Sequence, residues 1–123
     1  MKIQLHDVSA SESGDYYQVL FEGKLDGEQA YVLVQRQFEL PDGGLCYVES
    51  HDRNYIGHFK VTHAELGRTW FFLKLPRKTA AELEVVFNTT DKNWRQVARI
   101  MQIMIPRLRV SDRSTRVSVG TTR

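Results

Sequence analysis

Residues 83–106 read LEVVFNTTDKNWRQVARIMQIMIP, and within this stretch the spacing of the apolar residues changes. The first part alternates with a period of two and predicts a strand. The second part has the period of an amphipathic helix, which Thr90 caps and Pro106 ends. Ile100 and Ile103 lie off the main apolar stripe, so we expect either a well-buried helix or one that forms a homodimer interface. The stripe itself consists of Trp94, Val97, Ala98, Met101, Met104 and Ile105.

The chain before this stretch reads mostly as strands. Runs rich in aromatic and β-branched residues alternate with segments rich in Gly, Pro and polar residues, which predict turns. Among these segments, 9–15 predicts a loop, 41–44 (PDGG) a tight turn and 79–82 a single helical turn. The runs that predict strands are 1–8, 16–22, 29–40, 45–50, 55–61 and 69–75.

Seven strands followed by one helix predict the α+β fold class. Parallel strands need long crossover connections, and the connections here have the length of hairpins, so we expect mostly antiparallel pairing. The expected architecture is one strongly bent sheet of six to seven strands with the C-terminal amphipathic helix packed on it. We expect a single domain over residues 1–106 and an Arg-rich, flexible tail over 107–123. The order of elements also resembles that of pleckstrin-homology-like domains, which implies a fold and no function.

The charge is distributed unevenly along the 123 residues. The net charge is +2, but residues 107–123 hold five arginines and one acidic residue, a local charge of +4. This segment could bind phosphates weakly, whereas a folded nucleic-acid-binding domain carries its basic residues on a face of the domain, so we expect no nucleic-acid partner. No stretch approaches the roughly 20 apolar residues of a membrane span, and the N-terminus lacks the apolar segment of a signal peptide. We therefore expect a cytoplasmic bacterial or other intracellular protein without membrane association.

The sequence contains no motif typical of catalysis or metal binding. A P-loop, a G-x-S-x-G elbow and an H-E-x-x-H pair are all missing. The single cysteine, Cys46, excludes an internal disulfide framework, and its apolar neighbours favour a small buried side chain over a nucleophile. Of the neighbouring histidines His51, His58 and His63, the last two are five residues apart, which places them on opposite faces of a strand. We therefore expect no enzymatic activity, no cofactor and no metal.

The segment 47–55 (YVESHDRNY) is the most unusual part of the chain, because it is short, polar and charged and has a tyrosine at each end. Tyrosine and arginine are enriched among the residues that dominate protein interfaces, and charged side chains steer partners. One interpretation is a recognition surface, and the other is an ordinary hairpin loop with tyrosines at its edges. The candidate partner-binding residues are Tyr47, Glu49, His51, Asp52, Arg53 and Tyr55.

The order of short motifs resembles that of a family of small immunity proteins from bacterial polymorphic toxin systems, the family conventionally numbered ten. The resemblance covers about residues 15–105. It begins with an aliphatic strand that ends in Gln-Arg, continues through an Asp-Gly turn, a Tyr-x-Glu strand and an aspartate, and closes with hydrophobic strands and a last helix. The matching residues are 32–36, 42–43, 47–49, Asp52, 55–57, 70–73, 80–81 and 85–87.

This resemblance implies a protein that binds and blocks a cognate toxin in the cytoplasm and has no enzymatic activity. It carries over Tyr47, Glu49, Asp52 and Tyr55 as candidate contacts. The alternative that the residues leave open is a general protein-interaction or adaptor module with a PH-like arrangement of strands and helix, which could bind a peptide at a sheet edge.

Overall fold

The computed structural model describes residues 1–38 and 45–111. In this part of the chain, ten strands and one α-helix are formed. The helix, α1, is Asp91–Met104, and a short 3-10 turn, η1, is Arg53–Tyr55. The strands are β1 Lys2–Gln4, β2 Asp7–Ser13, β3 Tyr16–Leu25, β4 Glu28–Gln37, β5 Cys46–Ser50, β6 Gly57–Phe59, β7 His63–Leu66, β8 Trp70–Lys74, β9 Glu82–Val86 and β10 Arg109–Val110.

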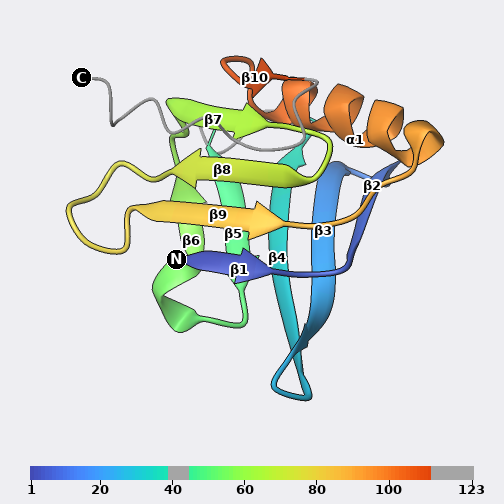
Figure 1. Cartoon of the computed structure of the whole chain (residues 1–123). Coiled ribbons are helices and arrows are strands. Elements are labelled where there is room, and N and C mark those ends of the chain that lie inside the picture. Colours follow the sequence, from blue (N-terminus) through green and yellow to red (C-terminus); the bar gives the residue numbers. More distant parts are fainter. Residues whose placement is uncertain (39–44, 112–123) are drawn as a thin grey trace.

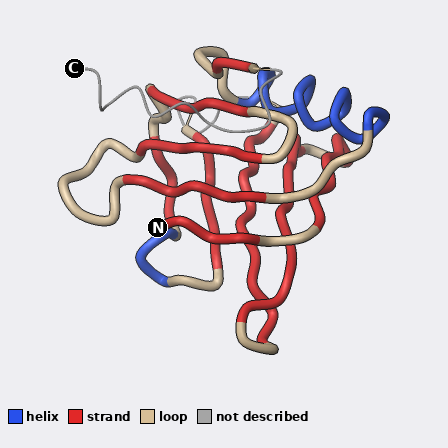
Figure 2. Tube along the Cα trace, viewed as in Figure 1, coloured by secondary structure: helices blue, strands red, loops and turns tan. Residues whose placement is uncertain are grey.

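The strands form two five-stranded sheets. The first sheet has the order β1-β9-β8-β7-β10 and the second has the order β2-β3-β4-β5-β6. Figure 1 shows the strands of the first sheet running across those of the second, with α1 along one end of both. Between the sheets, the Phe21 ring of β3 lies 5.5 Å from the Phe71 ring of β8 and 4.9 Å from the Phe87 ring, measured between ring centroids. Figure 2 shows in the same view that strand accounts for most of both layers.

The α+β class and the mostly antiparallel pairing are confirmed, but the prediction of one strongly bent sheet of six to seven strands is wrong. Pairs of strands that follow each other in the chain are antiparallel, as their short connections require. The two parallel pairs, β1 with β9 and β10 with β7, join strands that are distant in the chain. Alternation shows which residues face inward, but it does not show that the chain leaves one sheet after β6 and enters the other at β7.

The two sheets meet at a corner where β1 passes into β2. The amide of Leu5 donates to the carbonyl of Val86 in the first sheet at 2.8 Å, and the amide of His6 donates to the carbonyl of Glu22 in the second at 2.9 Å. Gly23 makes this crossing possible, since a Cβ at Gly23 would lie 2.9 Å from the backbone nitrogen of His6. The predicted single strand over 1–8 is therefore two strands in different sheets.

Two other local predictions are wrong. The expected loop over 9–15 is mostly strand β2, because one face of this edge strand is polar and the inward side chains are only Val8 and Ala10. The expected helical turn over 79–82 is a bend in which Ala80 has a φ of 48°, and Glu82 already belongs to β9. The predicted turn over 41–44 lies outside the described residues.

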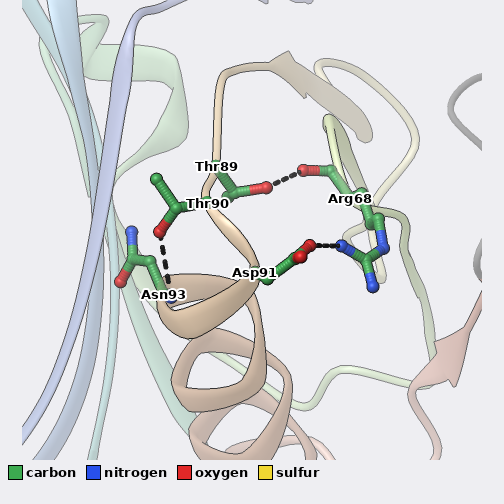
Figure 3. A network of polar contacts seen from close by, with 5 residues as sticks. All are labelled: Arg68, Thr89, Thr90, Asp91 and Asn93. Carbon is green, nitrogen blue, oxygen red and sulfur yellow. Dashed lines mark hydrogen bonds and ion pairs between the residues drawn. The ribbon is translucent and has the colours of Figure 1, made fainter.

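The helix begins as predicted. The hydroxyl of Thr90 accepts a hydrogen bond from the amide of Asn93 at 3.2 Å (Figure 3). Asp91, in the first turn, is favoured by the partial positive charge at the helix N-terminus and pairs with Arg68 at 2.5 Å. The hydroxyl of Thr89 donates to the carbonyl of Arg68 at 2.6 Å, so these contacts join the start of α1 to the turn between β7 and β8.

The two isoleucines off the main apolar stripe of α1 differ in burial, so the helix is not apolar on two sides. Ile100 is fully buried with Trp94 and Val97 in the core, whereas Ile103 is 40% exposed. The dimer prediction therefore depends on one exposed isoleucine and stays a prediction. Leu108 is buried beyond the helix and β10 pairs with β7, so the folded part continues past residue 106. No helix in the described ranges has the length and apolar character to cross a membrane.

We expect Thr90→Ala to lower the free energy of unfolding by about 1 kcal/mol, because one amide at the helix start loses its acceptor. Urea unfolding monitored by circular dichroism would measure this change. Thr90→Ser keeps the acceptor and should stay within about 0.5 kcal/mol of the parent. Equal losses in both variants would contradict the capping role of the hydroxyl.

Candidate interaction face on the second sheet

The outer face of the second sheet brings together polar and aromatic side chains from β4 and β5. Alternation sends Val32, Val34 and Val48 into the core, where each is fully buried. The residues between them therefore lie on the other face. In the register of these strands, Leu33 is opposite Glu49 and Gln35 is opposite Tyr47. Tyr31 and Tyr47 thus flank Glu49, one from each strand.

Glu49 accepts a hydrogen bond from each of these tyrosines. The Tyr31 hydroxyl donates to Oε2 at 2.6 Å, and the Tyr47 hydroxyl donates to Oε1 at 2.6 Å. All three side chains are partly buried. We call Tyr31, Glu49 and Tyr47 the carboxylate cluster. Both carboxylate oxygens thereby have a donor at the short distance typical of a charged acceptor.

The hydrogen bonds shift the pKa values of all three groups. The bonds from Tyr31 and then Tyr47 stabilise the charged carboxylate and lower the pKa of Glu49, although burial acts in the opposite direction. The bond to Glu49, together with burial, raises the pKa of Tyr31 from 10.0 to about 12. The pKa of Tyr47 is raised for the same reasons. Near neutral pH the cluster therefore carries one negative charge, on Glu49.

Two exposed histidines flank the carboxylate cluster. The His51 ring lies 6.4 Å from the Tyr31 ring, and its Nδ1 is 3.2 Å from both the amide nitrogen and the carbonyl oxygen of Tyr31. The His58 ring of β6 lies 5.0 Å from the Tyr47 ring. We call the carboxylate cluster with these two histidines the outer face. Beside it, a hollow of about 250 Å³ is lined by Tyr16, Gln35, Arg36, Gln37, Tyr47 and His58.

The structure brings together only part of the predicted segment. Tyr47, Glu49 and His51 lie on the outer face, whereas Asp52 and Tyr55 have structural roles. The Asp52 side chain caps η1 by accepting from the amide of Asn54 at 2.9 Å. The side chain of Tyr55 does not lie at an exposed edge of the segment 47–55.

Tyr55 is only 5% exposed, and its hydroxyl donates to the carbonyl of Glu82 at 3.1 Å. The guanidinium of Arg77 lies 5.5 Å from the centre of its ring. Arg53 is exposed within η1 and is not part of the carboxylate cluster. Tyr55 therefore does not lie on the outer face with Tyr47 and Glu49, because its ring is buried where the chain turns at η1.

Sequence reasoning missed Tyr31 and His58. Neither residue is among the candidate partner-binding residues of the segment 47–55. Alternation along 29–40 does place Tyr31 on the face opposite Val32, but it does not show which strand lies beside that face. The register between β4, β5 and β6, which brings both residues to Tyr47 and Glu49, has no local signal in the sequence.

Metal-binding groups and the position of Cys46 were the remaining questions of site chemistry that the sequence raised. Among residues 1–38 and 45–111, no group of three or more His, Cys, Asp or Glu side chains could hold a metal ion. Cys46 is buried on the inward side of β5, and its Sγ donates to the carbonyl of Met104 at 3.3 Å. The thiol therefore lies on the other side of the sheet from His58, which is paired with Tyr47 on the outer face.

Comparisons with protein-family models, curated proteins and solved structures found no match.

The pKa shift of Glu49 can be tested directly. Tyr31→Phe removes a donor to the charged form, so we expect the pKa of Glu49 to rise toward its ordinary value. Because the folded-state pKa is lowered, Glu49 stabilises the fold above its unfolded pKa, and this contribution is lost as pH falls through the folded pKa. Titration of the side-chain carboxyl carbon by NMR measures the shift. Tyr16→Phe removes a hydroxyl elsewhere on the sheet and should leave the titration unchanged; an equal change in both variants would contradict the assignment.

Proposed function

We propose that the protein is a non-catalytic binding protein that neutralises a cognate bacterial toxin, and that it binds the toxin through the outer face. The observation that carries the proposal is the carboxylate cluster. Glu49 is held in its charged form on a sheet face, and in the described part of the chain it has no ion-pair partner. The order of motifs that resembles the immunity-protein family supports the choice of a toxin as the partner.

The chemistry of the carboxylate cluster indicates what the partner presents. A carboxylate with a ring on either side suits a lysine or arginine, because the cation can pair with Glu49 and lie against a tyrosine. Tyrosines offer large contact area at a low cost in side-chain entropy, and they are enriched among the residues that dominate binding energy. The partner surface that fits is therefore basic at its centre.

Co-expression in bacteria tests the proposal. The toxin encoded by the neighbouring reading frame should kill the host cell, and the parent protein should restore growth. Glu49→Lys replaces the attraction with repulsion and should abolish the protection. Glu28→Lys makes the same charge change at an exposed position at the start of β4 and should protect fully.

Three outcomes count against the proposal in different ways. If the parent does not protect, the neutralising function is wrong. If Glu49→Lys protects as well as the parent, the function stands and the outer face is the wrong surface. If the parent binds the neighbouring toxin without reducing its lethality, a general adaptor role is favoured. Matching thermal melting curves for both variants exclude loss of folding as the cause.

A further inference from the structure

A second hollow lies where α1 ends, away from the carboxylate cluster. It measures about 280 Å³ and lies between the end of α1, the ends of β4 and β5, and the link from β6 to β7. Three of its lining residues are cations, namely Arg36, Lys60 and Arg107. We call this hollow the basic pocket. Its other described lining residues are Cys46, Val61, Thr62, Met104, Ile105 and Pro106.

Arg36 is held in place by the end of the helix. Its Nη1 donates to the carbonyl of Met104 at 2.7 Å, and its side chain is partly buried. This bond satisfies one of the carbonyls that a helix C-terminus leaves without a partner. A guanidinium has five N–H donors, so the contact fixes the group and leaves other donors for a ligand. Helix capping explains Arg36, but it does not explain the two other cations.

Lys60 and Arg107 have no such structural role. Neither forms a hydrogen bond or an ion pair within residues 1–38 and 45–111. No carboxylate is among the described residues that line the basic pocket. Three positive charges around one hollow repel one another, and an anion between them removes that repulsion.

We propose that the basic pocket binds a phosphate group. Arginine donors match phosphate oxygens in geometry, and lysine contributes a compact positive charge. Thr62, which also lines the basic pocket, carries a hydroxyl that can donate to a phosphate oxygen. The basic pocket shares only Arg36 with the hollow beside the outer face, so the site is additional to the proposed toxin-binding surface.

NMR titration of the full chain tests this site with inorganic phosphate as the probe and sodium chloride at equal ionic strength as the reference. We expect saturable shifts of the amides of 60–62, Met104, Ile105 and Arg107 that chloride does not produce. Lys60→Gln with Arg107→Gln should weaken binding by at least about tenfold, since two charge-assisted contacts are lost. Arg36 is left intact because its substitution would also disturb the helix end.

The matched control is Lys24→Gln with Lys78→Gln, which removes the same charge from exposed positions outside the basic pocket. This variant should bind phosphate within about twofold of the parent. An equal loss in both double variants, or shifts that chloride reproduces, would overturn the site. Adenosine 5′-monophosphate and adenosine, titrated in parallel, separate two sources of the group. Similar affinities for inorganic phosphate and the nucleotide indicate the phosphate alone, and binding of adenosine without phosphate would contradict the proposal.

Discussion

Phe21→Ala is expected to lower the free energy of unfolding by about 3–5 kcal/mol, the range for removing a buried phenyl ring. Phe21 is fully buried and contacts two other rings, Phe71 and Phe87, that belong to the opposite side of the core. The substitution leaves a cavity between the two sheets, which cannot close without moving both. With about 4 °C of melting temperature lost per kcal/mol, the effect is easily measured by calorimetry.

Phe38→Ala is the matched control for this substitution. The Phe38 side chain is 45% exposed, and its ring packs against that of Tyr17, at 4.4 Å between centroids. We expect a cost of about 1 kcal/mol or less. If Phe21→Ala cost no more than Phe38→Ala, the packing of the two sheets around Phe21 would be wrong.

Gly67→Ala is expected to destabilise the protein by about 1–3 kcal/mol through a steric clash. Gly67 begins the turn between β7 and β8, where its amide donates to the carbonyl of Trp70 at 2.8 Å. A Cβ at Gly67 would overlap the Nε1 and Cε2 atoms of the Trp70 indole. Trp70 is only 4% exposed, so the ring has to leave a buried position. Alanine also lowers the conformational entropy of the unfolded chain, which stabilises the fold by about 0.4–1 kcal/mol. This gain in stability is smaller than the destabilisation caused by the clash.

A double-mutant cycle separates this clash from other effects of the alanine. Trp70→Ala destabilises the protein by itself, but it removes the ring that the new methyl group meets. In that background Gly67→Ala should cost almost nothing, which gives a coupling energy of about 1–3 kcal/mol between the two positions. Additive effects of the two substitutions would show that the indole does not pack on Gly67. Chemical unfolding of the four proteins supplies the measurement.

The helix could be predicted from local signals alone. Thr90 and Pro106 bound it, and the apolar period identifies its buried face, because capping and helix periodicity depend on neighbouring residues. The same reasoning could not decide where Ile100 and Ile103 point. Both lie near the edge of the apolar stripe, and only the packing of α1 on β2 and β3 buries the first and exposes the second.

The sheets show the limit of local signals more clearly. Alternating burial in β4 and β5 follows from the sequence pattern, but the division into two sheets depends on pairs that are distant in the chain, such as β1 with β9. Strand β2 was predicted as a loop because most of its side chains are polar, and an edge strand needs few apolar residues. The corner at Gly23 depends on the close approach of His6, which has no signature beyond the glycine itself.

Only part of the candidate site could be predicted, because alternation is a local signal and strand register is not. Tyr47, Glu49 and His51 share one face of a strand and its end, so alternation alone places them together. Tyr31 reaches Glu49 only through the register of β4 with β5. Tyr55 looked like an exposed residue because its neighbours are polar, but η1 turns the chain and buries the ring.

Calorimetric titration with the purified toxin domain measures whether this protein partner binds at Glu49. Glu49→Gln keeps the shape of the side chain and removes its charge, whereas Glu28→Gln makes the same change at an exposed site outside the outer face. We expect Glu49→Gln to weaken the affinity by about a hundredfold and Glu28→Gln to leave it unchanged. If the parent binds tightly and Glu49→Gln binds equally tightly, the toxin does not bind at Glu49.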